Sequence, residues 1–192
     1  MNLALAKQLM EKSGVSFVQG LTAAELGAAE QRWGLRFPPD LAEFLRYALP
    51  VSAGWFDWRS PDDPAIQNAL AWPREGICRE IEQNAFWPDQ WGSRPAGSSA
   101  ALEMAQAQLT EAPRLAPLCG HRYIPAEPLE TGNPVFSVYQ TDIICYGANL
   151  WEYLSNEYSY YFRGPGAQLT VSKNVKRIRF WSWLADLNDG AA

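Results

Sequence analysis

The chain has 192 residues, of which 47% are hydrophobic and 19% charged, so it can fill a core and lacks the composition of a disordered segment. Its net charge is −5 and its pI is about 4.9, which argues against a general nucleic-acid binder because such proteins need a cationic surface. The length suits one domain, and no internal repeat or convincing linker divides it.

The N-terminal segment, residues 1–19, predicts a helical extension. Its apolar start is interrupted at Lys7, and Glu11 and Lys12 follow, so it forms neither a secretory signal nor a membrane span. The three cysteines form no CxxC pair and no metal-finger spacing, which is typical of reduced thiols in the cytoplasm. We therefore expect a cytoplasmic protein without a membrane segment.

Two helices are predicted next. Thr22 and Glu25 have the spacing of a capping box, and Gly34 can take the left-handed conformation that ends a helix. A second helix is expected to begin at Pro39 and to end at Pro50. The short connection between the two predicts a helical hairpin.

The middle of the chain is less regular. Residues 55–58 indicate a short strand or an aromatic loop, and weak helical periodicity covers residues 64–72 and 77–81. Residues 86–97 are rich in Trp, Pro and Gly and predict an irregular loop. Residues 98–112 predict a surface helix capped by Ser98 or Ser99.

The second half favours strands. Four segments have strand character: 114–118, 121–124, 134–139 and 143–146. A helix capped by Asn149 should follow them, and the aromatic segment 178–184 should dock on the domain. This order predicts an α+β fold in which a mostly antiparallel sheet is wrapped by helices, with the helices on one side.

His121 is the only histidine, and Cys119 lies two residues before it on the same predicted strand face. A Cys–His nucleophile would also need an orienting group and an oxyanion site, and no pattern indicates either. We interpret His121 as a strand-end residue with a local hydrogen bond. One histidine and three scattered cysteines do not form a zinc site.

Catalytic motifs are absent from the sequence: no GxGxxG, Walker loop, HExxH or GxSxG occurs. Carboxylate pairs occur at Asp62/Asp63, Glu80/Glu82 and Glu127/Glu130, among turn or surface residues. We therefore expect no catalytic residues, no metal and no cofactor.

The charge and the loop tryptophans suggest a partner-binding surface instead. Residues 61–161 contain 5 basic and 13 acidic side chains, whereas residues 1–60 balance at 6 and 6 and residues 162–192 contain 5 and 2. An acidic middle can attract a basic protein, or it can simply keep the surface solvated. Loop tryptophans can anchor an interface or pack into the core. The candidate partner-binding residues are Trp55, Asp57, Trp58, Asp62, Asp63, Glu75, Glu80 and Glu82.

Two ordered stretches resemble the SUKH superfamily, which includes the domain of a yeast cell-wall-synthesis regulator. The first is Gly20-Leu21-Thr22 with Glu25 and Glu30, then Trp33-Gly34-Leu35-Arg36-Phe37-Pro38-Pro39-Asp40, then Phe44-Leu45. The second is residues 132–144, then Tyr146-Gly147, Leu150, Tyr153-Leu154 and Glu157-Tyr158. Together they cover residues 20–162.

The resemblance implies an α+β domain over residues 20–192. It also implies, for bacterial members, an immunity protein that binds and neutralises a toxin, often a nuclease, and it carries no catalytic residues. The chain departs from the pattern in two places: the acidic-Gly-aromatic region after the second helix is matched only loosely at residues 53–57, and residues 62–113 form a long insert. Two alternatives remain open: a regulatory or scaffold module, and a glycan-binding protein that uses loop tryptophans such as Trp87 and Trp91.

Overall fold

The structure, a computed structural model, describes residues 2–52, 54–166, 168 and 170–188. The helices are α1 (Leu3–Lys12), α2 (Ala23–Trp33), α3 (Pro39–Tyr47), α4 (Pro64–Gln83), α5 (Ser98–Thr110), α6 (Leu150–Glu157), α7 (Ser159–Arg163) and α8 (Trp181–Asn188), with a short 3-10 turn η1 (Asp89–Trp91). The strands are β1 (Phe17–Gln19), β2 (Ala48–Pro50), β3 (Leu115–Cys119), β4 (Arg122–Pro125), β5 (Val135–Tyr139) and β6 (Asp142–Gly147). The predicted α+β class is confirmed.

The main sheet is an antiparallel meander in the order β3-β4-β5-β6, so each strand pairs with its neighbour in sequence. The four predicted strand segments all take part in it. Alternation along β4 and β5 places Tyr123 and Phe136 on one face and Ile124 and Val135 on the other. Both faces are therefore apolar, and both need cover.

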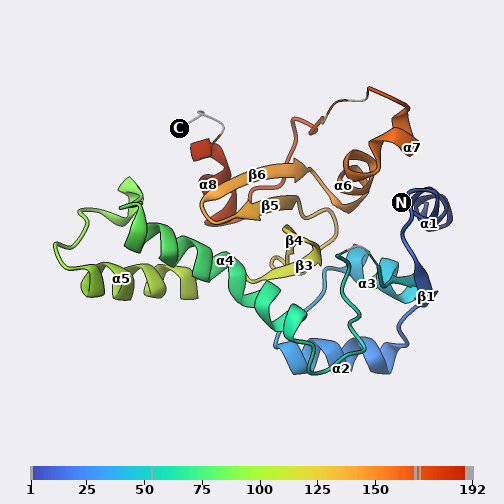
Figure 1. Cartoon of the computed structure of the whole chain (residues 1–192), viewed down its shortest axis with the longest axis horizontal. Helices are drawn as coiled ribbons and strands as arrows, with labels where there is room; N and C mark the ends of the chain where they lie inside the picture. Colours follow the sequence, from blue (N-terminus) through green and yellow to red (C-terminus); the bar gives the residue numbers. More distant parts are fainter. Residues whose placement is uncertain (1, 53, 167, 169, 189–192) are drawn as a thin grey trace.

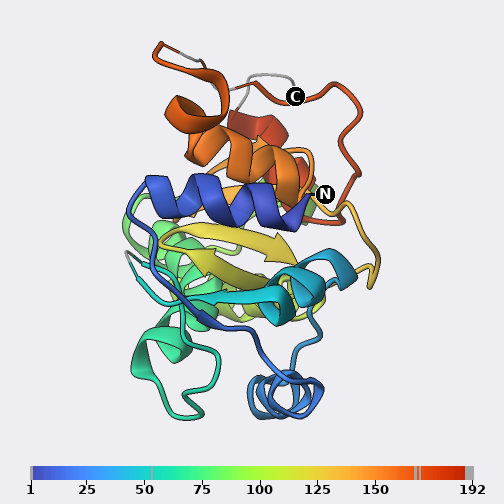
Figure 2. The same cartoon turned by 90° about the vertical axis from the view of Figure 1, so that its right-hand side faces the viewer.

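Helices cover both faces of this sheet, which corrects the expectation of helices on one side only. Ile124 and Val135 belong to a core that includes side chains of α1, α3 and α6. Tyr123 and Phe136 belong to a second core with side chains of α4, α5 and α8. Figure 2 shows the sheet between these two groups of helices. The two-sided burial follows from the apolar residues on both faces of β4 and β5.

The insert, residues 62–113, forms a helical arm beside the sheet. Figure 1 shows α4 and α5 lying side by side, and the two helices are in contact. The two weakly periodic segments belong to one continuous helix, α4, which passes through Pro73. The predicted surface helix is confirmed as α5, although Gly97 occupies its N-cap position in place of Ser98 or Ser99. Its buried residues lie four apart, so they share one side of the helix; they are Ala101, Ala105 and Leu109.

Several predicted boundaries are confirmed and others move. The capping box of α2 forms between Thr22 and Glu25, and Gly34 ends the helix in the left-handed conformation. The helix expected to reach Pro50 ends at Tyr47 instead, because the following residues form β2 and pair with β1. The helix capped by Asn149 ends at Glu157, and α7 follows after Tyr158.

The first and last described helices are part of the packed body. Ala6 and Met10 of α1 are fully buried in the first core. The C-terminal segment docks as predicted, with Ile178, Trp181 and Leu184 buried in the second core. None of the described helices is both long and apolar enough to cross a membrane.

Candidate partner-binding surface

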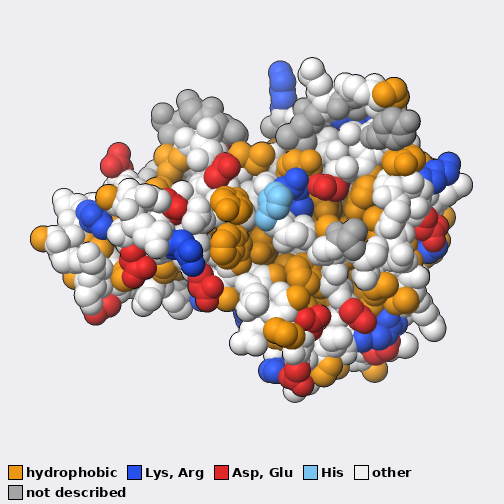
Figure 3. Space-filling view, in the orientation of Figure 1, with side chains coloured by type: hydrophobic (Ala, Val, Ile, Leu, Met, Phe, Trp, Pro, Cys, Tyr) orange, Lys and Arg blue, Asp and Glu red, His pale blue; other side chains and the backbone are white. Residues whose placement is uncertain are grey.

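The acids of the middle segment are partly neutralised by basic side chains from elsewhere in the fold. Asp62 pairs with Arg32 at 2.7 Å, and Glu130 pairs with Lys176 at 3.1 Å. Acidic and basic side chains are interspersed over the face seen in Figure 3. The excess of acidic over basic side chains in residues 61–161, 13 against 5, therefore does not become one continuous acidic patch on this face.

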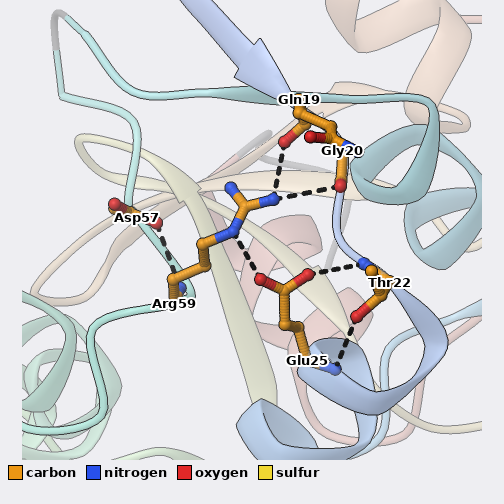
Figure 4. A network of polar contacts seen from close by, with 6 residues as sticks. All are labelled: Gln19, Gly20, Thr22, Glu25, Asp57 and Arg59. Carbon is orange, nitrogen blue, oxygen red and sulfur yellow. Dashed lines mark hydrogen bonds and ion pairs between the residues drawn. The ribbon is translucent and has the colours of Figure 1, made fainter.

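The loop that carries the predicted anchors, residues 51–63, is fastened to α2 by Arg59 (Figure 4). The Arg59 guanidinium donates to the Glu25 carboxylate at 2.8 Å and to the carbonyls of Gln19 and Gly20 at 2.7 and 3.0 Å. The other Glu25 oxygen accepts from the Thr22 backbone N–H at 2.7 Å. One carboxylate thus joins the helix cap to the loop.

This fastening buries the two tryptophans that were expected to face a partner. Trp55 is 8% exposed and Trp58 is 3% exposed, and both belong to the first core. The Trp55 indole N–H donates to the Tyr158 hydroxyl at 3.0 Å, and Trp58 packs edge-on against Phe37. The expectation that Trp55 and Trp58 are exposed anchors is therefore wrong, because the large apolar rings gain more by burial in the core. Ala53, part of the loose family match, lies outside the described residues.

The acids of this loop have local structural roles. The Asp57 carboxylate accepts from the Arg59 backbone N–H at 3.0 Å, which stabilises a turn. Asp63 is the N-cap of α4 and accepts from the Ala65 N–H at 2.8 Å. Asp62 remains the most accessible of the three, although its carboxylate also binds Arg32.

The acids of α4 divide between two sides of the helix. Glu75 and Glu82 are seven residues apart and exposed, so they share one outward stripe. Glu80 lies on another side, where it accepts from the Asn84 side chain at 2.7 Å. The helical rise separates Asp63 from Glu82 by about 28 Å. The predicted acids therefore do not converge, and only Glu75 and Glu82 share a surface.

An aromatic pair that sequence reasoning missed lies beside this stripe. Tyr139, at the end of β5, is 58% exposed and packs on Trp72 of α4 with ring centroids 5.9 Å apart. Close contact is possible because Gly76 has no side chain: a Cβ there would lie 2.9 Å from the Gln140 Cα. The sequence does contain a signal for this position: Tyr139 is a large aromatic residue directly before the predicted turn between two strands. At the end of a strand, side chains of the neighbouring strands cannot cover such a ring. We call Trp72, Glu75, Glu82 and Tyr139 the Tyr139 surface.

A compact polar cluster adjoins this surface on the sheet. Arg122 donates to Glu157 at 3.1 Å and to Ser137 at 2.8 Å, and its guanidinium lies 3.8 Å from the centre of the Tyr146 ring. The carbonyl of His121 accepts from the Val138 N–H, next to Tyr139 along β5. Figure 3 shows the single histidine exposed beside hydrophobic side chains.

The Cys119–His121 pair does not have the electrostatics of a nucleophile and its base. Burial, with the Glu157 charge as a smaller cause, raises the pKa of the Cys119 thiol to about 11, so the thiol is protonated near neutral pH. Burial and the Arg122 charge lower the pKa of His121, whose ring contacts Arg122. Within the described part of the chain, no group of three or more His, Cys, Asp or Glu side chains could hold a metal ion.

The tryptophans of the predicted loop 86–97 pack on each other and on the C-terminal segment. Trp87 and Trp91 form an edge-to-face pair with centroids 5.3 Å apart, and Trp91 stacks on Phe180. The Trp87 N–H donates to the Gly92 carbonyl at 2.8 Å. Both rings are half-buried, so part of each face that a sugar ring would need is already covered.

Comparison with known proteins found no match. No protein family, no curated protein and no solved structure matches this chain. The SUKH resemblance therefore remains a prediction from the sequence.

Proposed function

We propose that this chain is a non-catalytic protein-binding module that acts as an immunity protein and neutralises a basic toxin. The resemblance to SUKH immunity proteins supports the class of function. The acidic composition supports a basic partner, because opposite charge accelerates encounter and disfavours wrong partners. The partner surface in this proposal differs from the one expected at first, because Trp55 and Trp58 are buried.

The observation that carries the proposal is the exposed Tyr139 ring, which packs on the half-buried Trp72 of α4. Tyr and Trp dominate the binding energy of protein interfaces. Here Tyr139 ends a paired strand and Trp72 lies within a helix of 20 residues, so little conformational freedom is lost when a partner packs on them. Tyr139 and Trp72 therefore take the anchoring role that was first assigned to the loop tryptophans.

The acids around this pair are proposed to steer the partner. Glu75 lies three residues after Trp72 on the same helix, and Glu82 lies two turns further along the same stripe. Neither forms an ion pair with a described residue. Asp57, Asp63 and Glu80 are held by local hydrogen bonds, so their substitution is expected to affect stability more than association.

The test is association with the protein encoded immediately upstream of this chain, measured by biolayer interferometry at low and high salt. We expect Tyr139→Ala to increase the dissociation rate about tenfold or more, the effect of losing a hot-spot side chain. The double variant Glu75→Gln/Glu82→Gln should slow association at low salt and reduce its salt dependence. The double variant Glu103→Gln/Glu111→Gln is the matched control, since it makes the same two-charge change at exposed positions on α5 and at its C-cap.

Several results would argue against the proposal. If the upstream protein does not bind, it is not the partner; if it binds and the binding is unchanged in Tyr139→Ala, the Tyr139 surface is not the interface. An association rate that is insensitive to salt and to both glutamate changes would refute acidic steering. A gene for cell-wall synthesis in the upstream position, with no toxin, would favour the regulatory alternative.

A further inference from the structure

A cleft of about 650 Å³ lies between the last turn of α2 and the first half of α4. Gln67, Leu70, Ala71 and Arg74 line it from α4, at the spacing that places all four on one helix face. Arg32 and Trp33 line it from α2, and Pro113, Arg114, Leu115 and Trp181 complete its walls. Its volume is in the range of small-molecule sites.

Three arginines converge on this cleft, although the whole chain is acidic. Arg32 is paired with Asp62 at the rim, and Arg114 donates to the Gly34 carbonyl at the end of α2. Neither Arg74 nor Arg114 has a carboxylate partner within ion-pair distance among the described residues. Both Arg74 and Arg114 line the cleft, and the pKa of Arg114 is lowered by burial and then by the positive charge of Arg74. An anion placed between them would offset their like charges.

The remaining lining suits the organic part of a ligand. The Trp33 ring belongs to this lining, although its indole N–H is buried. Leu70, Pro113 and the mostly buried Trp181 add apolar surface to the cleft. A flat ring could lie against these residues while its anionic group reaches the arginines.

We propose that this cleft binds a small molecule that carries a phosphate group on a flat heterocycle, the chemistry of a nucleotide. Guanidinium groups bind phosphate oxygens through paired N–H donors, and two of them on one cleft can hold one phosphate from both sides. The site is independent of the protein-binding proposal: of the Tyr139 surface it shares only Glu75, which lies at the cleft margin. Either proposal can fail without the other.

Isothermal titration calorimetry of the full chain with ADP, inorganic pyrophosphate and adenosine tests this. We expect ADP to bind most tightly, pyrophosphate more weakly, and adenosine weakest of the three, because only ADP uses both parts of the cleft. Arg74→Ala should weaken ADP binding about tenfold or more, since it removes a charged hydrogen-bond donor. Arg79→Ala, five residues along the same helix and outside the cleft, is the matched control and should change the affinity by less than about twofold.

Several outcomes would overturn the proposal. One is the absence of binding by all three probes at millimolar concentrations. Another is adenosine binding as tightly as ADP, which would leave no role for the phosphates. If Arg74→Ala and Arg79→Ala lose the same amount of ADP affinity, ADP is attracted by positive charge in general and not bound in this cleft. Because the Arg74 side chain is exposed and forms no ion pair with the described residues, its removal should leave the thermal midpoint unchanged, and a melting curve checks this.

Discussion

The Tyr123 hydroxyl lies 3.0 Å from the carbonyl oxygen of Ala69 and donates a hydrogen bond to it. Ala69 is four residues before Pro73, and its carbonyl would ordinarily accept from the backbone N–H at position 73. Proline has no such N–H, so the carbonyl would be left without its helical partner. A side chain from β4 therefore supplies the donor that α4 lacks, and this bond also fixes the helix to the sheet.

This relationship predicts a specific coupling. Tyr123→Phe should cost about 1–3 kcal/mol of unfolding free energy, because it leaves the Ala69 carbonyl unsatisfied. In a Pro73→Ala background the helix regains its own donor, and the same substitution should cost less. Urea denaturation of the four members of this cycle measures the difference. Additive costs would mean that Tyr123 does not replace the missing donor.

The Glu25 carboxylate predicts a pH dependence of stability. Hydrogen bonds from the Thr22 backbone, and then from Arg59, lower its pKa from 4.5 to about 2. A group with a depressed folded pKa stabilises the fold above its unfolded pKa, and this contribution is lost as pH falls through its folded pKa. The stability advantage of the natural chain over Glu25→Gln should therefore be full above pH 4.5 and disappear as pH approaches 2. Thermal midpoints measured over this range, with Glu103→Gln as control, test it; a pH-independent difference would contradict the assignment.

Two glycines within helices predict opposite effects of alanine. Gly27 in α2 has open space where a Cβ would lie, so Gly27→Ala should stabilise the chain by about 0.5–1 kcal/mol. Gly76 in α4 faces Gln140, whose Cα would be 2.9 Å from an added Cβ, so Gly76→Ala should destabilise it. Denaturant midpoints that move in the same direction for both would show that α4 does not approach the β5–β6 hairpin this closely.

The thiol of Cys119 should be unreactive in the folded chain. Because burial raises its pKa to about 11, little thiolate is present at pH 8, and iodoacetamide should modify Cys119 far more slowly in the folded than in the unfolded state. Mass spectrometry of the peptide after alkylation with and without guanidinium measures the ratio. Equal rates in the two states would contradict the buried, protonated thiol.

Substitutions in α2 and α3 test how much a helix cap and a buried ring contribute to the free energy of unfolding. Thr22→Ala removes the oxygen that accepts from the Glu25 N–H and should cost about 1 kcal/mol. Phe44→Ala removes a fully buried ring and should cost roughly 3–5 kcal/mol. Unchanged denaturant midpoints in both variants would refute these roles.

Much of the fold could be predicted from the sequence because its signals are local. The capping box at Thr22, the Asn149 cap and the β-branched strand segments each act within a few residues, so the sequence predicts these elements and their order. The sequence predicts that the second helix reaches Pro50, whereas it ends at Tyr47. The following residues form β2 only through their pairing with β1, about thirty residues away, and the hydrophobic periodicity of a segment carries no information on such pairing.

The candidate surface depended on tertiary structure for the same reason. Composition indicated an acidic chain with loop tryptophans, but it could not show that Arg59 closes the loop and buries Trp55 and Trp58. Nor could it show that Gly76 brings Tyr139 against Trp72, or that Arg74 and Arg114, 40 residues apart in sequence, share one cleft. The sequence by itself determined the capped helices, the four strands of the main sheet and the net charge, because these follow from neighbouring residues. The fold alone decided which rings are buried and which charges meet, because burial and Coulomb energy depend on distance in space.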